Sequence, residues 1–294
     1  SPSFSRGSKM EFILCDIGNE PRMRRIFETF RPGIVYHAAA YKHVPVMESN
    51  PAEAVLTNVR GTLVTARMAA ATGVKKFIMV STDKAVNPTN VMGASKRIAE
   101  MITQAVGSGS TTRFITTRFG NVLGSSGSVI PLFRSQIEKG GPVTVTHPEV
   151  TRFFMTIPEA CRLVLEAGTT GNGGEIFVFD MGKPVRILDL ARKMIQLAGL
   201  IPDKDIAIRY TGLRPGEKLY EELLNVAENT LPTRHPLILR ARVRDQEAGV
   251  TLGAVEELIA LVPAGNNTAL IRKMKEIVPE FLSRNSEFEA LDGG

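Results

Sequence analysis

The chain has 294 residues, of which 43% are hydrophobic and 22% are charged, and this balance excludes collagen-like and wholly disordered proteins. Its two cysteines are too few for a disulfide framework and indicate a reducing compartment. The formal net charge of +6 favours an anionic ligand, with a basic surface that only aids solubility as an equal alternative.

The same arithmetic argues against two classes of partner. No stretch reaches the roughly 18 uncharged apolar residues that cross a bilayer, and residues 1–9 hold no apolar core of a secretory signal. No run of five Lys or Arg residues and no nucleic-acid-binding motif is present, so we expect no nucleic acid partner.

Strand-like and helix-like segments alternate in the first half of the chain. Apolar and β-branched runs predict strands at 11–16, 34–40, 76–81 and 112–118. Helical spacing of apolar residues predicts helices at 21–30, 51–72 and 94–106. This rhythm is typical of an α/β fold, a doubly wound parallel sheet with helices on both faces.

The pattern loosens after residue 121. We expect a flexible loop at 124–127, helices at 128–139, 158–168 and 188–199, and extended segments at 142–146 and 175–180. A Pro/Gly turn at 212–217 is predicted to open a helix that runs to residue 225. A strand at 236–240 and helices at 254–262 and 268–281 follow, and the polar residues 283–294 are expected to fray.

The first cluster of polar residues comes directly after the apolar run 77–80. It consists of Ser81, Thr82, Asp83 and Lys84. In open α/β sheets ligands bind at the carboxyl ends of the strands, so these side chains are placed to face a ligand. They would supply a hydroxyl, an acid and a base. An ordinary turn that ends the strand is the alternative interpretation.

The second cluster, residues 87–96, contains Met92 and Lys96 four positions apart, on one face of the predicted helix. Taken alone, Met92 fits a buried core residue. The segment resembles the extended short-chain dehydrogenases/reductases, which carry Tyr-x-x-x-Lys at this place. With Met92 at the Tyr position and Thr82-Asp83-Lys84 upstream, the chain is similar to the large membrane-anchored (CapD-like) nucleotide-sugar 4,6-dehydratases of polysaccharide biosynthesis.

The resemblance covers residues 10–225, with further matching blocks at 15–17, 38–45, 57–62, 118–122, 129–131, 151–153 and 213–218. It implies an NAD site made of Asp16, Ile17, Ala38, Ala39, Ala40, Lys42, Asn58, Ser81, Lys96 and Phe119. It implies a nucleotide-sugar site made of Lys42, His43, Asn121, Val129, Pro131, Thr144, Arg152, Arg214 and Glu217. For each of the two arginines a surface salt bridge is the alternative.

The resemblance also implies a Rossmann-type unit formed by residues 10–125 with part of 170–200. A smaller substrate-binding part would comprise 126–170 and 200–282, with flexible ends at 1–9 and 283–294. No G-x-G-x-x-G motif is present, so we expect the chain to be a piece of a longer protein that enters this fold at its third strand. The longer protein would carry transmembrane helices upstream, in the inner membrane, with this part on the cytoplasmic face. By itself the chain is expected to bind NAD weakly.

The implied reaction oxidises C4 of the sugar, eliminates water across C5 and C6, and reduces C6, using one bound NAD. The catalytic residues would be Thr82, Asp83, Lys84, Met92 and Lys96. By the family pattern Asp83 is the acid and Lys84 the base, which requires a lowered pKa from burial and from Lys96. Thr82 would hydrogen-bond the C4 oxygen and Lys96 the nicotinamide ribose. A thioether has no proton to exchange, so Asp83 is expected to take the C4 hydroxyl proton in place of Tyr.

Two other functions remain open. A nucleotide-sugar 4-epimerase has the same fold, but it relies on the Tyr and lacks the Asp-Lys pair. A non-catalytic nucleotide-binding relative would explain the missing Tyr but not the Thr82, Asp83, Lys84 and Lys96 set. UDP-N-acetylglucosamine is the expected substrate, a homodimer the expected assembly, and no metal site is predicted.

Overall fold

The computed structural model describes residues 9–125, 127–222, 230–241 and 247–293. Its main sheet has the strand order β1-β2-β3-β8-β12-β11. The bounds are β1 (Ile34–His37), β2 (Lys76–Val80), β3 (Arg113–Arg118), β8 (Ile176–Phe179), β12 (Ile238–Ala241) and β11 (Thr230–Pro232). The first four strands pair in parallel and the last two antiparallel. The predicted α/β class with a parallel sheet is thereby confirmed.

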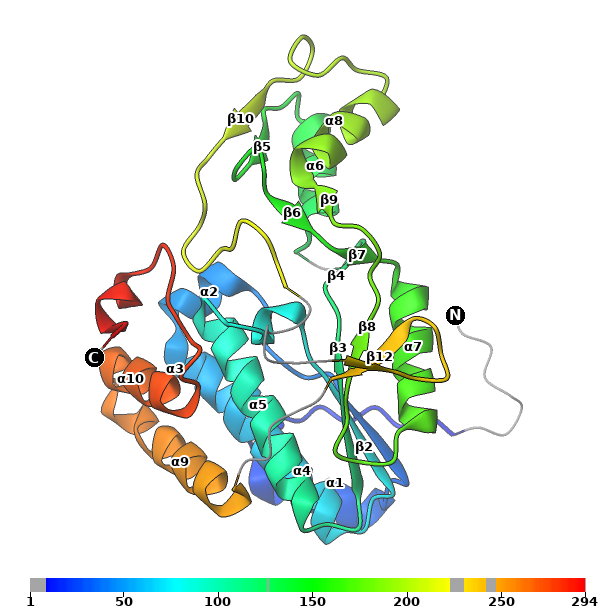
Figure 1. Ribbon diagram of the computed structural model, residues 1–294, viewed down its shortest axis with the longest axis vertical. Coiled ribbons are helices and arrows are strands. Elements are labelled where there is room, and N and C mark those ends of the chain that lie inside the picture. The colour runs from blue at the N-terminus through cyan, green and yellow to red at the C-terminus, as the bar shows by residue number, and fades with distance from the viewer. Residues whose placement is uncertain (1–8, 126, 223–229, 242–246, 294) are drawn as a thin grey trace.

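Helices cover both faces of this sheet (Figure 1). One face carries α1 (Glu20–Phe30), α2 (Val44–Ser49), α3 (Pro51–Ala54), the π-helical turn η1 (Val55–Arg60), α4 (Gly61–Ala71), α5 (Val91–Ser108), α9 (Ala248–Ala260) and α10 (Asn267–Ile277). The other face carries α7 (Ile157–Thr170), which packs on β2 and β3. Among the described residues no helix combines the length and apolarity that a membrane crossing needs.

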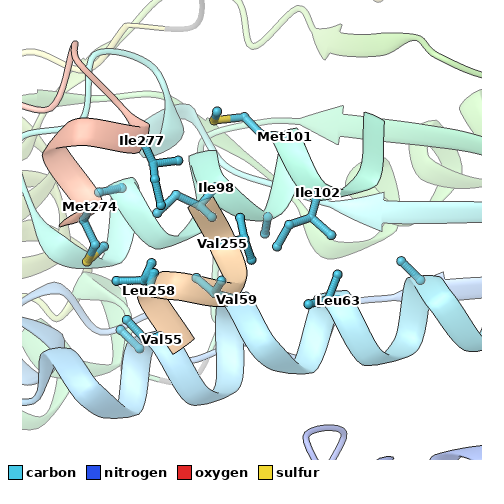
Figure 2. Packing of buried hydrophobic residues seen from close by; sticks show 14 of the residues in the cluster. Val55, Val59, Leu63, Ile98, Met101, Ile102, Val255, Leu258, Met274 and Ile277 are labelled. Atoms are coloured by element: carbon cyan, nitrogen blue, oxygen red, sulfur yellow. The ribbon is translucent and has the colours of Figure 1, made fainter. Parts of the chain in front are cut away.

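The largest core lies between the helices of the first face (Figure 2). Val55, Val59 and Leu63 point from the continuous run of η1 and α4 toward Ile98 and Ile102 of α5. The helices α9 and α10 close this core with four further apolar side chains, namely Val255, Leu258, Met274 and Ile277. Burial of this apolar surface holds α5 rigidly against the sheet, and α5 carries two of the candidate site residues.

A second group of elements stands above the carboxyl ends of the sheet strands (Figure 1). It comprises α6 (Val129–Glu138), α8 (Ile187–Leu197), β5 (Val143–Val145), β10 (Ile208–Tyr210), β6 (Thr151–Arg152) and β9 (Val185–Arg186). A separate core that includes Phe133, Val143 and Ile195 holds α6, α8 and β5 together. The short pair β4 (Asn121–Val122) and β7 (Phe154–Met155) joins this group to the sheet.

The packing differs from the expected division of the chain. The helix α7 lies within 126–170 but packs on the main sheet, and α9, α10 and β12 lie within 200–282 but also belong to the sheet side. Conversely, α8 lies within 170–200 and packs with α6 and β5. Residues that are close in sequence therefore separate, because each amphipathic helix buries its apolar face on the nearest uncovered surface.

Two local expectations were wrong. Residues 11–16 form no strand: Phe12 and Leu14 are exposed, and the segment finds no pairing partner among the described residues. Residues 217–222 are not helical, because the carbonyls of Lys218 and Leu219 accept hydrogen bonds from Arg152 instead. The remainder of that expected helix lies outside the described residues, as do residues 1–8 of the expected flexible start and residue 126 of the expected loop.

The chain end was also expected to fray, and it packs on the protein instead. The backbone N–H groups of Leu282 and Arg284 donate to the carbonyls of Pro88 and Thr89. The short 3-10 helix η4 (Glu287–Leu291) then buries the ring of Phe288. Polar composition misled here because the backbone of this segment and polar side chains such as Ser286, whose Oγ donates to Glu48 Oε2 at 2.8 Å, are hydrogen-bonded to the protein.

Candidate active site

A cavity of about 520 Å³ opens where the carboxyl ends of β1, β2 and β3 face the upper group of elements. Parallel strands bring these ends to one edge of the sheet, so segments far apart in sequence converge there. Most of the residues singled out from the sequence line this cavity. They are Ala38, Ala40, Lys42, His43, Ser81, Thr82, Lys84, Met92, Lys96, Phe119, Asn121, Val129, Thr144, Arg152, Arg214 and Glu217.

The other predicted residues lie elsewhere. Asp16 lines a second cavity of about 400 Å³, and Tyr41 lines both cavities. Ile17 packs against the helix at Gly61, where a Cβ would come within 2.5 Å of its Cδ1. Ala39, Asn58, Asp83 and Pro131 do not line the larger cavity.

The turn after β2 is organised around the carboxylate of Asp83. The residue Asp83 begins the 3-10 turn η2 (Asp83–Ala85), and the backbone N–H of Asp83 donates to the Phe119 carbonyl. Thr82 Oγ1 donates to Asp83 Oδ1 at 2.9 Å, and Lys84 Nζ donates to the same oxygen at 3.0 Å. Asp83 is fully buried, and its Oδ2 has no hydrogen-bond partner among the described residues. The acid therefore reaches the cavity through the hydroxyl and the amine that it holds.

Lys84 does not have the lowered pKa that a resting lysine base requires. Burial alone would lower the pKa of Lys84, but the carboxylates of Asp83 and Glu221 raise it above its ordinary value. Lys84 Nζ also donates to Asn121 Oδ1 at 3.2 Å. The expected pKa direction was wrong because the sequence did not reveal the second carboxylate, and Lys84 is an ammonium in this arrangement.

The pKa of Lys96 is shifted in the opposite direction from that of Lys84. Burial lowers the pKa of Lys96 to about 8, against an opposing contribution from Glu100. Its Nζ donates to the carbonyl of Val80 at 2.8 Å, at the end of β2. Met92 lies one turn earlier in α5 and is also buried, so its thioether forms part of the apolar wall.

The start of α5 is pressed against the Thr82–Lys84 turn. Asn90 caps the helix by accepting from the Gly93 N–H at 2.7 Å. A Cβ at Gly93 would come within 2.2 Å of the Lys84 carbonyl oxygen. Only glycine permits this approach, which brings the α5 residues and the Lys84 residue to the same cavity.

Asn58 acts as a brace beneath the cavity and does not face it. Its Oδ1 accepts from Tyr41 N at 2.8 Å, and its Nδ2 donates to Tyr41 O at 3.0 Å and to Ser95 Oγ at 2.9 Å. Asn58 lies in the π-helical turn η1, an irregularity frequent at functional sites. It ties the small-residue segment after β1 to α5.

The two arginines at the far end of the cavity differ. Arg152 is buried, and its guanidinium donates to Glu217 Oε1 at 3.0 Å and to nearby backbone carbonyls. Arg214 is exposed and its Nε contacts Glu217 Oε2 at 3.3 Å. Arg152 therefore holds the protein's own chain, and Arg214 is the arginine of the two that is open to a ligand.

Sequence reasoning missed Glu221. It lines the cavity, is buried, and lies 3.6 Å from Lys84 Nζ and 3.7 Å from Arg152 Nε. Its position was predicted to be on a helix, where nothing indicated that its side chain points inward. Its pairing with Lys84 and Arg152, which precede it by 137 and 69 positions, could therefore not be predicted. The only available signal was its place in the acidic pair that follows Tyr220.

Comparisons with known proteins identify the family of the chain. Residues 4–243 match the family described as polysaccharide biosynthesis protein. The chain is 60% identical to the capsular polysaccharide biosynthesis protein CapD of Staphylococcus aureus over 76% of its length and 37% of that protein. It is 51% identical to the probable polysaccharide biosynthesis protein EpsC of Bacillus subtilis, over 85% of this chain and 42% of that one. It thus spans about two fifths of these relatives.

More distant matches carry other names. A UDP-glucose 4-epimerase of Rickettsia rickettsii is 40% identical over 75% of this chain and 63% of that protein. Pen from Bacillus thuringiensis superimposes with a TM-score of 0.72 at 33% identity, over 84% of this chain and 81% of that one.

The dTDP-glucose 4,6-dehydratase DesIV of Streptomyces venezuelae, solved with NAD bound, superimposes with a TM-score of 0.64 at 21% identity, over 70% of this chain and 68% of that one. At this identity the likeness shows the fold alone, which is the Rossmann-type fold of these enzymes. The chain belongs to the polysaccharide biosynthesis protein family.

Proposed function

We propose that the chain carries the catalytic centre of an NAD-dependent nucleotide-sugar 4,6-dehydratase, with a UDP-linked N-acetylglucosamine as substrate. The observation that carries this proposal is a hydrogen-bonded set: Thr82 and Lys84, which line the cavity, both donate to the buried carboxylate of Asp83 behind them. Elimination of water from a sugar needs an acid and a base side by side. An alcohol oxidation alone does not need both.

The residues present fit NAD. Asp16 and Lys96 lie on two cavities that share Tyr41 as a wall residue, and NAD has two ends to bind. Its adenosine end would be held at Asp16, and its nicotinamide ribose at Lys96, beside Ser81 and Phe119. When bound, NAD accepts the hydride from C4 of the sugar and returns it to C6. The DesIV structure solved with NAD supports the choice of cofactor for this fold.

Thr82 and Asp83 can remove the proton of the C4 hydroxyl. Met92 lines the cavity where a phenol would serve in relatives that carry Tyr, and a thioether cannot take a proton. The Thr82 hydroxyl is already bonded to Asp83 Oδ1 at 2.9 Å. A proton from the C4 hydroxyl would pass through Thr82 Oγ1 to this carboxylate, leaving a C4 ketone.

Lys84 becomes a base only after that step. Its ammonium is stabilised by two carboxylates, and protonation of Asp83 neutralises one of them. The pKa of Lys84 then falls, so its ammonium releases a proton to solvent water, and the neutral amine takes the proton of C5, which the ketone makes acidic. The Asp83 carboxyl returns its proton to the C6 hydroxyl, which departs as water. Lys84 finally returns the C5 proton as C6 is reduced, and with Asp83 ionised again its amine regains a proton from water.

The 4-epimerase alternative rests on the name of the Rickettsia relative. An epimerase exchanges hydride and proton at C4 only, so it has no use for the Asp83–Lys84 pair. A non-catalytic relative would not need Lys96 buried with a pKa lowered to about 8. The epimerase alternative therefore leaves the Asp83–Lys84 pair without a role, and the non-catalytic alternative leaves the buried Lys96 without one.

Mass spectrometry tests the proposal. The full-length natural protein is incubated with UDP-N-acetylglucosamine and NAD, and the sugar nucleotide is expected to lose one water. Asp83→Asn is expected to abolish the product, while the exposed Asp189→Asn, which only loses an ion pair with Arg186, retains it. An unchanged mass with inverted C4 would show an epimerase, and binding without turnover would show a non-catalytic protein.

A further inference from the structure

A row of side chains of alternating charge crosses the cavity wall. From the reactive end to the open end it consists of Asp83, Lys84, Glu221, Arg152, Glu217 and Arg214. Each neighbour pair is joined by a nitrogen–oxygen contact of 3.0 to 3.7 Å. The two longest contacts, 3.6 and 3.7 Å, are both made by Glu221 Oε1.

Glu221 is the only member of this row whose contacts are all longer than ordinary hydrogen bonds. Its side chain is 4% exposed, and its Oε2 has no hydrogen-bond partner in the described part of the chain. Burying a carboxylate lowers the stability of a protein unless nearby cations offset the lost hydration. The compensation here comes from Lys84 on one side and Arg152 on the other.

We propose that Glu221 is a positioning residue that holds the Lys84 amine at the cavity wall and keeps it protonated until the reaction begins. This inference rests on the proposed function, because it assigns Lys84 a chemical role. Asp83 cannot do the same, since it is itself assigned a proton transfer. Glu221 lies on the other side of Lys84 Nζ in the row, and no proton transfer is assigned to it.

The electrostatic surroundings of Lys84 agree with this role. Asp83 from η2 and Glu221 from the 217–222 segment raise the pKa of Lys84, and Arg152 from β6 lowers it, as does burial. Asn121 from β4 contributes a neutral acceptor. Loss of the Glu221 charge leaves one carboxylate against Arg152 and burial, so Lys84 should lose its proton at lower pH.

A purely structural role for Glu221 gives a different expectation. If it served only to compensate Arg152, its removal would lower the stability of the protein without changing the titration of Lys84. The distinguishing measurement is therefore the pH at which Lys84 becomes a neutral amine, and it does not depend on turnover.

The test compares Glu221→Gln with Glu222→Gln in the full-length protein. Glu222 is the adjacent residue, and its exposed carboxylate contacts Lys218 and Asn87. Acetic anhydride labels neutral amines, and peptide mass spectrometry gives the labelling rate of Lys84 at each pH. We expect the Lys84 midpoint to fall by roughly 1 pH unit or more in Glu221→Gln and to stay at the wild-type value in Glu222→Gln.

Turnover provides a second readout. The low-pH limb of the kcat profile should move in the same direction in Glu221→Gln, with a smaller change in KM. An unchanged Lys84 midpoint in folded Glu221→Gln overturns the proposal. If that variant does not fold, Glu221→Asp keeps the charge but withdraws it by one methylene, and it should give a smaller fall. A wild-type midpoint in folded Glu221→Asp would then overturn the proposal. If wild-type protein dehydrates no sugar, the proposed function fails while the labelling still decides the role of Glu221.

Discussion

The buried ion pair between Glu100 and Arg118 gives the most quantitative prediction. Arg118 Nε donates to Glu100 Oε1 at 2.8 Å and Nη2 to Oε2 at 2.6 Å, and both residues are almost fully buried. Ser81 Oγ donates to the same carboxylate at 2.6 Å. The pair therefore lies directly behind the cavity, at the ends of β2 and β3.

Arg118→Met keeps an unbranched apolar stem in place of the arginine stem and removes the charge. Glu100 would then be buried with Arg97, at 3.2 Å, as the cation still in salt-bridge contact with it. Removing one partner of a buried pair costs about 3–5 kcal/mol. Although burial raises the pKa of Glu100, Arg118 and the other donors lower it to about 2 from 4.5, which corresponds to about 3 kcal/mol. Both routes predict a loss of about 3 kcal/mol or more near pH 7.

The pH dependence has a defined sign. A carboxyl whose pKa is lowered by folding contributes stability above its unfolded value, and this stability is lost as pH falls through the folded value. The difference in unfolding free energy between wild type and Arg118→Met should therefore narrow as pH falls from about 4.5 toward about 2.

Urea unfolding followed by circular dichroism measures this difference at each pH. Arg113→Met is the matched control, because Arg113 begins the same strand and is exposed; it should change stability by less than about 0.5 kcal/mol. A loss below about 1 kcal/mol in Arg118→Met at pH 7, comparable to a surface pair, would refute the reasoning that this buried pair stabilises the protein.

Three further predictions concern other parts of the site. Gly216→Ala should lower the unfolding free energy by about 1–3 kcal/mol more than Gly212→Ala. Both glycines have positive φ, but only at Gly216 does the added Cβ meet Asn90, at 2.4 Å. Equal losses in urea titrations of the two variants would contradict this clash. Burial and, to a smaller extent, the charge of Lys96 lower the pKa of His37 to about 3. Wild type should therefore lose stability relative to His37→Gln as the pH falls from 6.5 to 3, and parallel curves of stability against pH would contradict this prediction. Lys96 should become reactive toward acetic anhydride with a midpoint near pH 8, and a midpoint near 10.5 would show that its amine is hydrated.

Much of the site could be expected from sequence because it follows strands directly. Polar residues that directly follow a strand of a parallel sheet must lie at the carboxyl edge, and Ser81, Thr82 and Lys84 therefore line one cavity. Helical spacing placed Met92 and Lys96 on one face of a helix, and the resemblance to the Tyr-x-x-x-Lys segment assigned Lys96 to the site. These inferences depend on local periodicity, which a single sequence displays.

The electrostatics of Lys84 and Arg152 were decided only by the tertiary structure. Glu221 reaches both cations from a segment that sequence periodicity assigned to a helix, and the carbonyls of Lys218 and Leu219 turn toward Arg152 instead. A pKa depends on the distances to charges from every neighbouring element. The sequence by itself therefore determined which chemical groups meet at the sheet edge, whereas long-range packing determined which of them are charged and which are already paired.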